Sequence, residues 1–362
     1  MLNPRVQILI GSNRATGLLA LPFANQCKIN LSLKEMTSTC TISLAKKINI
    51  RNSQYNSSRA LQDVVRGGQR VRVYARYDQE STDENFKRLE FAGWVRNINP
   101  QVPMEIECED EMYILKRHEV APKVFKGGKV SDVVKYIVQD IVVQGHAGHY
   151  VLDVLDSALG GAFAITRDEN TAAKVLAKIE EVYGLKSNFR FKEVEGQVQN
   201  ILMVGTQYMS TQGGAAVRYV LNRNVITNSL SYTRASDKQI RVRVSSRQAD
   251  GKAITAKFRG DNEGDTKELQ IPGLTQAQVE EYAKRLYEES KVDSFEGSIT
   301  TFGLPVISPG MLAYVQAPDY EINETTNYVD EVQTSIGVEG YRREITLGPR
   351  LSQNNQLTLI AQ

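Results

Sequence analysis

Short apolar runs separated by Gly, Pro, Asn and Asp dominate the segment from Ser294 to Gly348. Alternation of apolar and polar residues is typical of antiparallel strands that bury one face. Proline fixes φ and glycine admits a positive φ, so Pro309-Gly310 predicts a turn and a strand should begin at Met311. The segment therefore predicts consecutive strands over Ile299–Phe302, Met311–Val315, Tyr328–Val332 and Tyr341–Leu347.

The first third of the chain shows the same alternation. Asp78–Asn85 is polar throughout and predicts a hairpin loop. Trp94, the only tryptophan, lies between Gly93 and Val95, and we expect it to pack inside the fold instead of anchoring an interface. Strands with one apolar face are predicted at Cys27–Leu33, Cys40–Leu44, Val71–Tyr77, Leu89–Ile98 and Met104–Cys108.

Helical spacing replaces this alternation in the middle third. Ser131–Val142 predicts one helix with a valine and isoleucine stripe, namely Val133, Val134, Ile137, Val138 and Ile141. Thr171–Tyr183 predicts a second helix, capped by Asn170 or Thr171 and ended by Gly184. Two strands should follow, at Asn188–Phe191 and Gln199–Val204.

Strands return after Asn224-Val225-Ile226. We expect them at Leu230–Tyr232, Ile240–Val244, Ala256–Phe258 and Lys267–Ile271, followed by a helix over Thr275–Glu289 with the capping-box pair Thr275 and Gln278.

The elements together predict a mainly β fold with an α+β insertion: two tube-like antiparallel β-barrel domains plus a small α+β domain. The first barrel would span 1–118, the insertion 119–228 and the second barrel, with one packed helix, 229–348, leaving a C-terminal tail at 349–362. No residue repeat links the two barrel segments, although their similar lengths allow a duplication of structure.

Composition is that of a globular protein with two or three domains: 362 residues, 41% hydrophobic and 24% charged. No run is long enough for a membrane helix, and Met1–Ile10 is too short for a secretory signal, so we expect a cytoplasmic origin. Net charge falls from +5 over 1–118 to +1 over 119–228 and −4 over 229–362. Cys27, Cys40 and Cys108 form no C-x-x-C pair and should be reduced and buried.

Motifs for catalysis are missing from the sequence. No nucleophile elbow, phosphate-binding loop or dinucleotide fingerprint occurs. His146 and His149 have a spacing that two metal ligands can use, but the flanking glycines favour a solvated loop. Gly260–Asp265 lacks the spacing of a calcium loop and predicts a hairpin. We therefore expect no catalytic, cofactor-binding or metal-binding residue.

One strand is basic and carries aromatic residues, a pattern that nucleic-acid-binding surfaces share. Arg70, Arg72 and Arg76 have the same parity and should project from one face, with Arg66, Tyr74 and Tyr77 nearby. We prefer the interpretation that this strand face is exposed to solvent or lines a channel. If DNA contacts it, we expect DNA to pass along it transiently and not to be recognised by sequence.

The order of several short motifs resembles the late-control D protein and baseplate hub family of contractile phage tails, which is related to the hub part of type VI secretion spike proteins. The resemblance rests on glycine, proline and apolar positions of the last segment, namely Gly303, Pro305, Ile307, Pro309, Gly310, Tyr328, Val329, Val332, Gly340, Tyr341, Leu347 and Gly348. Weaker matches are Phe91, Gly93, Val95, Cys108 and Asp110 in the first third, Tyr183, Gly184, Leu185 and Phe189 in the second, and the entry at Asn224.

This resemblance implies a structural protein of a phage tail or related contractile injection machine, not an enzyme. It implies a homotrimer whose two tube-like barrels per chain make a pseudo-six-fold ring, joining a hexameric tail tube protein to a trimeric central spike protein. Other baseplate proteins would be further partners, and the location would be the virion tail baseplate, assembled in the bacterial host cytoplasm. The alternatives are a peptidoglycan hydrolase with β-barrel binding modules, whose paired carboxylates no motif marks, and a nucleic-acid-binding module.

Overall fold

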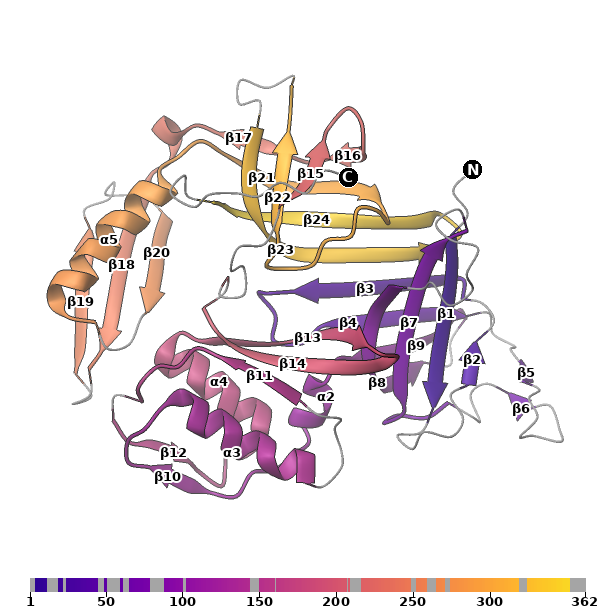
Figure 1. The fold of residues 1–362 in the computed structure, drawn as a ribbon, viewed down its shortest axis with the longest axis horizontal. Helices are drawn as coiled ribbons and strands as arrows, with labels where there is room; N and C mark the ends of the chain where they lie inside the picture. Colours follow the sequence, from indigo (N-terminus) through magenta and orange to yellow (C-terminus); the bar gives the residue numbers. More distant parts are fainter. Residues whose placement is uncertain are drawn as a thin grey trace.

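The computed structural model describes residues 4–351, apart from short gaps, and Figure 1 shows their arrangement. The residues outside this description are 1–3, 12–18, 22–23, 45–48, 51–58, 61–64, 79–87, 100–101, 144–149, 160, 207, 209–215, 249–251, 259–264, 271–273, 319–323 and 352–362.

A 14-stranded sheet forms the body of the molecule, and strands from both ends of the chain belong to it. In its N-terminal half the neighbours run β3-β4-β9-β8-β7-β1-β2, and each of the five strands predicted there is confirmed. The strands are β1 (Pro4–Gly11), β2 (Leu19–Leu21), β3 (Gln26–Ser32), β4 (Thr39–Leu44), β7 (Arg70–Tyr77), β8 (Arg88–Asn99) and β9 (Met104–Glu109). Separately, β5 (Asn49–Ile50) pairs with β6 (Arg59–Ala60).

The C-terminal half of the sheet contains the four strands predicted between Ser294 and Gly348. Pro309-Gly310 forms the expected turn, with Gly310 at a φ of 84°, and the next strand begins one residue later than predicted, at Leu312. The strands of this half are β15 (Val217–Val220), β16 (Val225–Asn228), β17 (Ser231–Thr233), β21 (Ser294–Phe302), β22 (Leu312–Gln316), β23 (Glu324–Gly337) and β24 (Gly340–Arg350).

Pairing between β23 and β3 joins the two halves. The strands are antiparallel, with Val332 opposite Leu31 and Ile336 opposite Cys27. Each strand thereby covers an edge that the other half would otherwise leave open. The mainly β fold with an α+β insertion is confirmed, and in the described ranges its strands follow one open order instead of closing into two barrels.

The insertion has its own core between two helices and small sheets. Thr171 caps the second helix, accepting a hydrogen bond from the Lys174 backbone at 3.4 Å, and Gly184 ends it in the left-handed conformation. Its three-stranded sheet has the order β11-β14-β13. The elements are α2 (Met112–Leu115), β10 (Lys123–Phe125), α3 (Val130–Val143), β11 (Tyr150–Val154), β12 (Phe163–Ile165), α4 (Ala172–Tyr183), β13 (Lys186–Val194) and β14 (Gln197–Gly205).

Residues 240–290 differ from the prediction, because they form a sheet and helix of their own. The sheet has the order β19-β18-β20, and the helix packs Val279 and Ala283 against it. β19 is antiparallel and β20 parallel to β18, and the two strands lie on opposite sides of it. The hairpin predicted at Gly260–Asp265 lies, except for Asp265, outside the described residues. The elements are η1 (Ala235–Asp237), β18 (Ile240–Arg247), β19 (Ala253–Phe258), β20 (Asp265–Gln270) and α5 (Gln276–Ser290), and the capping box of Thr275 and Gln278 is present.

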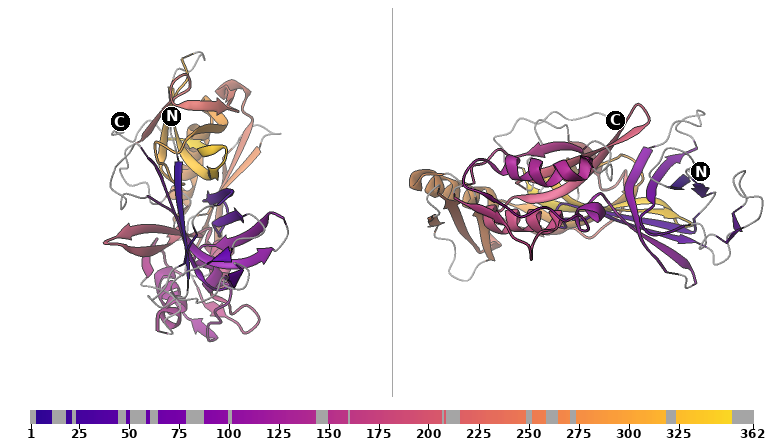
Figure 2. Two further views of the ribbon diagram at one scale, coloured as in Figure 1. Left: turned by 90° about the vertical axis from the view of Figure 1, so that its right-hand side faces the viewer. Right: turned by 90° about the horizontal axis from the view of Figure 1, so that it is seen from below.

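In Figure 1 the insertion lies below β3, the C-terminal strands β21, β22 and β24 lie above β3, and the β18–β20 sheet with α5 occupies the left-hand end. The view from below in Figure 2 shows the same end position of this sheet and helix. Among the described helices, none combines the length and apolar character needed to span a bilayer.

Candidate functional site

The candidates for metal or thiol chemistry in the sequence are the histidine pair, one acidic segment and the three cysteines. His146 and His149 lie outside the described residues, as does most of the acidic segment Gly260–Asp265. Within the described ranges, His, Cys, Asp and Glu side chains form no group of three that suits a metal ion. The three cysteines are buried with free thiols, and burial raises the pKa of Cys40 well above its ordinary value.

The basic strand β7 engages its side chains in internal contacts. The Arg70 guanidinium pairs with Glu111 and lies 4.0 Å from the ring centroid of Trp94. The Tyr74 hydroxyl donates to Glu193 at 3.1 Å. Arg72 and Arg76 are half-buried on the same strand face, Arg66 is exposed before the strand, and Tyr77 points into the core. Trp94 is buried, as predicted, and the strand is not an open nucleic-acid platform.

The large sheet instead presents one broad polar face that runs through both halves. Along β24, β23, β3, β4 and β9, alternate residues are buried and apolar for the most part, whereas most of those between them are polar and at least partly exposed; Ser32 and Glu109 are polar but buried. Side chains of a strand alternate between faces, so these polar residues share one surface. We call it the polar face: Lys28, Asn30, Thr39, Thr41, Ser43, Glu105, Glu107, Glu331, Gln333, Ser335, Arg342, Glu344 and Thr346.

The charge of the polar face is mildly acidic, since its carboxylates outnumber its cations. Glu107 is paired with Arg96 at 2.8 Å, and Glu344 accepts a hydrogen bond from Ser298 at 2.8 Å. Short hydroxyl and amide side chains fill the remaining positions. A surface of this kind offers water many hydrogen-bonding groups, and its four glutamates outnumber the two cations Lys28 and Arg342, which disfavours binding of a phosphate backbone.

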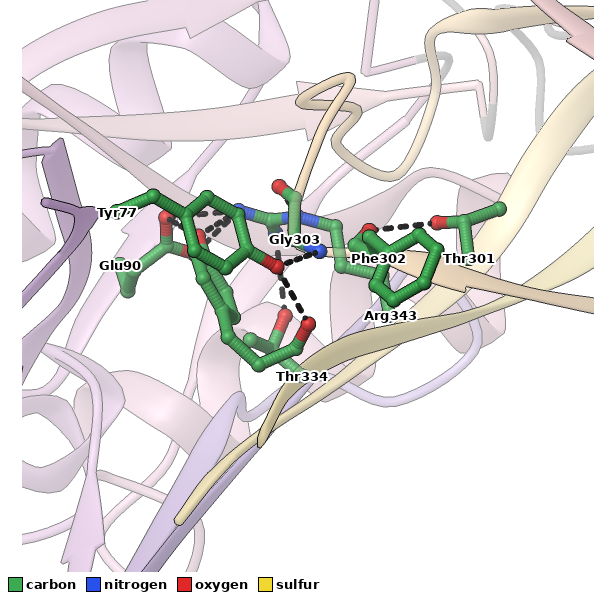
Figure 3. Close-up of polar contacts among 8 residues, drawn as sticks. Tyr77, Glu90, Thr301, Phe302, Gly303, Thr334 and Arg343 are labelled. Atoms are coloured by element: carbon green, nitrogen blue, oxygen red, sulfur yellow. Dashed lines mark hydrogen bonds and ion pairs between the residues drawn. The ribbon is translucent and has the colours of Figure 1, made fainter. Parts of the chain in front are cut away.

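A buried charged junction lies on the opposite side of the sheet, where the first and last thirds meet (Figure 3). Arg343 of β24 donates from Nη2 to both carboxylate oxygens of Glu90 on β8 at 2.7 Å. Its Nε donates to the Gly303 carbonyl at 2.9 Å and its Nη1 to the Thr334 hydroxyl at 3.1 Å. Burial acts to lower the pKa of Arg343, and Glu90 and Tyr341 more than offset it. Both charges are therefore fully paired in the interior.

Two tyrosines complete this junction. The Tyr77 hydroxyl donates to the Tyr341 carbonyl at 2.8 Å and accepts from the Gly303 amide at 2.9 Å. The Tyr341 hydroxyl donates to Glu90 at 2.5 Å, and burial raises the pKa of Tyr341. Gly303 packs so closely on the Tyr341 ring that a Cβ there would lie 2.3 Å from ring carbons, which explains a glycine of the resemblance motif.

A second buried carboxylate joins the insertion to the large sheet. Glu111 accepts hydrogen bonds from Trp94 at 3.1 Å, Tyr150 at 2.9 Å and Asn200 at 2.9 Å, besides its pair with Arg70. Neither this junction nor that of Glu90 was foreseen from the sequence. The one available signal was a charged residue at a core-facing position of an alternating strand, as at Arg343.

Comparison with solved structures finds counterparts of the whole chain, whereas no protein-family model and no curated protein matches its sequence. The 43 kDa tail protein of prophage MuSo2 from Shewanella oneidensis aligns with a TM-score of 0.56 at 14% identity, over 95% of this chain and 98% of that one. A tail protein of Neisseria meningitidis aligns with a TM-score of 0.57 at 14% identity, over 95% and 96%.

A type VI secretion component of E. coli, described as similar to the T4 bacteriophage tail proteins gp27 and gp5, aligns with a TM-score of 0.54 at 13% identity, over 96% of this chain and 77% of that one. The chain therefore has the fold of these tail and secretion proteins.

Proposed function

We propose that this protein is a structural component of a contractile phage tail or related injection machine, and specifically its baseplate hub. The observation that carries the proposal is the similarity in fold to the prophage MuSo2 tail protein of Shewanella oneidensis and to the tail protein of Neisseria meningitidis. In each case the alignment covers nearly the full length of this chain and of the other protein. The polar face supports the proposal, because a structural tail component needs an extended hydrated surface more than a concave catalytic site.

The proposed assembly is a homotrimer that forms a ring. Each chain contributes two β-rich segments, one from each end of its sequence, that share a sheet through the pairing of β3 with β23. Three such chains would present six similar segments, which suits a hexameric tail tube on one side and a trimeric spike on the other. The spike, the tube and neighbouring baseplate proteins are the partners of this proposal.

The polar face would line the channel of the ring. We place the insertion outside the ring, with its strand β13 next to the cavity that Arg343 also lines. An acidic channel wall would let DNA pass during injection without retaining it.

Electron microscopy of the purified protein tests this arrangement. We expect class averages with three-fold symmetry, a central channel and pseudo-six-fold modulation of the wall. A label attached to Gln333→Cys should appear in the channel, and one attached to Val338→Cys, at a hairpin whose side chain is 94% exposed, serves as the comparison site. Particles without a channel, or labels of Gln333→Cys on the outer surface, would contradict the proposal.

A further inference from the structure

A cavity of 680 Å³ lies where the large sheet, the insertion and the loop before β22 meet. One wall is residues 188–193 of β13, and the facing walls are residues 31–33 at the end of β3 and 88–90 at the start of β8. Ser308 and Pro309 of the loop complete it. We call this space the edge cavity. It is distinct from the polar face, because none of the polar-face residues lines it.

The edge cavity runs along the edge of β13. Six consecutive residues of this strand line it, so residues of both parities contribute. Side chains of one parity would line a cavity on a strand face, whereas both parities together mark a strand edge. Within the described ranges β13 pairs with β14 alone, so its other edge keeps unpaired backbone N–H and C=O groups.

Strand β8 begins at the same cavity. Leu89 pairs with Tyr74 of β7, and among the described residues the pairing of β8 with β9 starts only at Trp94. The edge of β13 along this cavity forms a template for an additional strand.

Two polar side chains of β13 add a chemical preference. Arg190 is half-buried, its Nη2 donates to the Pro309 carbonyl at 3.2 Å, and it makes no ion pair with any described residue. Burial lowers the pKa of Arg190. The negative charge of Asp153 acts in the opposite direction but does not offset the effect of burial. Asn188 is 9% exposed, and its Oδ1 accepts no hydrogen bond from the described residues. Glu90, Glu193 and Glu195 also line the cavity, but Glu90 is paired with Arg343 and Glu193 accepts a hydrogen bond from Tyr74. Buried polar groups are normally satisfied, so Arg190 can still take a carboxylate and Asn188 an N–H donor.

We propose that the edge cavity binds an extended acidic segment of another protein by strand addition. The backbone of the segment pairs with the open edge of β13, a carboxylate of the segment binds the Arg190 guanidinium, and one of its N–H groups donates to Asn188 Oδ1. Six residues of β13 line the cavity, which corresponds to a segment of about 20 Å. A nucleic acid lacks the alternating backbone donors and acceptors that strand edges require. The site is independent of the tail function proposed above.

Selection from a library of random hexapeptides tests the proposal. The full-length protein serves as bait and Arg190→Gln as the counter-bait. We expect enriched peptides to carry Asp or Glu at one fixed position between β-branched residues. For the strongest peptide, Arg190→Gln should weaken binding about tenfold or more, as expected for loss of a charge-assisted hydrogen bond. Arg167→Gln, at an exposed arginine of the same insertion, is the matched control and should leave the affinity unchanged.

Two changes in the peptide test the same contacts without a protein variant. Replacement of the acidic residue by its amide should weaken binding to the same extent, and N-methylation of alternate backbone amides should abolish it. Absence of enrichment over the counter-bait, or binding that tolerates both changes, would overturn the proposal. A variant that ends at Leu351 identifies another occupant: if it binds the peptide at least tenfold more tightly, residues 352–362 of this chain fill the cavity and the proposal is wrong.

Discussion

Arg343 is charged at any physiological pH, yet only 2% of its side chain and 5% of that of Glu90 are exposed. Two ions in the interior are costly to desolvate, so they persist only where each finds its counterpart and its remaining donors are satisfied. In this chain the counterpart lies 253 residues away along the sequence. At the residue scale, this pair links β8 in the first third of the chain to β24 in the last third more specifically than apolar packing does.

Loss of one partner should therefore be far more harmful than loss of an exposed pair. Glu90→Gln leaves the Arg343 charge buried, and we expect the free energy of unfolding to fall by about 3–5 kcal/mol. Glu107→Gln, which removes a half-exposed partner of Arg96, should lower it by less than about 1 kcal/mol. Urea denaturation of the two variants makes the comparison, and equal losses would show that the Glu90 junction does not tie the two halves of the sheet together.

Asp110 makes stability depend on pH in an identifiable window. Burial raises its pKa to about 7, although the backbone amides of Ser38 and Met112 donate to it and act in the opposite direction. The unfolded chain ionises this group near pH 4, so its contribution to stability is complete below about pH 4 and is lost as the pH rises to about 7. The loss is on the order of 4 kcal/mol. Unfolding free energies measured from pH 4 to pH 8 should show this fall, and Asp110→Asn should remove it. Parallel curves for the two proteins would exclude Asp110 as the source.

At the scale of single elements, the strands and helices follow from local pattern, and their partners do not. The stripe on α3, the Thr171 cap of α4 and the capping box of α5 depend on residues within one or two turns, so the sequence predicts them. The separate β19-β18-β20 sheet depends on parallel pairing across a connection, and β10 to β12 are short strands with weak alternation. The edge cavity could not be predicted from the sequence for the same reason: the alternation within a strand does not reveal which of its edges lacks a partner.

The close approach of β8 and β9 explains why glycine occupies position 93, one of the positions at which the sequence resembles the hub family. A Cβ at Gly93 in β8 would lie 2.1 Å from the Glu109 carbonyl oxygen of β9, which is backbone and cannot move aside. Gly93→Ala should separate these strands and lower the free energy of unfolding by about 1–3 kcal/mol or more.

Gly67→Ala is the control for this prediction. A Cβ at Gly67 would meet its nearest atom, the Arg96 carbonyl oxygen, at an ordinary 3.5 Å. This variant should stay within about 0.5 kcal/mol of the wild type. Calorimetry compares the melting temperatures, and similar values for both variants would contradict the close approach of β8 and β9 at Gly93.

At the scale of the whole molecule, one polar face crosses both halves of a continuous sheet. Its residues come from strands that begin at Gln26 and end at Arg350, so no single segment of sequence reveals it. The acidic excess of this face also changes the interpretation of the basic strand. Arg70 of β7 is paired with Glu111, and the wall proposed to line a channel carries more carboxylates than cations.

This distribution of charge predicts weak interaction with DNA. The wild-type protein should give no gel shift with duplex DNA at about 50 mM salt, because the polar face repels phosphates. Glu331→Lys combined with Glu344→Lys should produce a shift that disappears as the salt concentration rises. Salt-sensitive binding by the wild type would instead favour a nucleic-acid-binding module.

The most direct test of the central claim is the solution mass of the purified protein. Light scattering over a dilution series should give about 122 kDa for the protein alone, three times the 40.5 kDa of one chain. If the protein alone is a monomer, its complex with the spike protein from the same tail should contain three copies of this chain. A mass of 40.5 kDa at every concentration, with and without the spike protein, would contradict a trimeric hub.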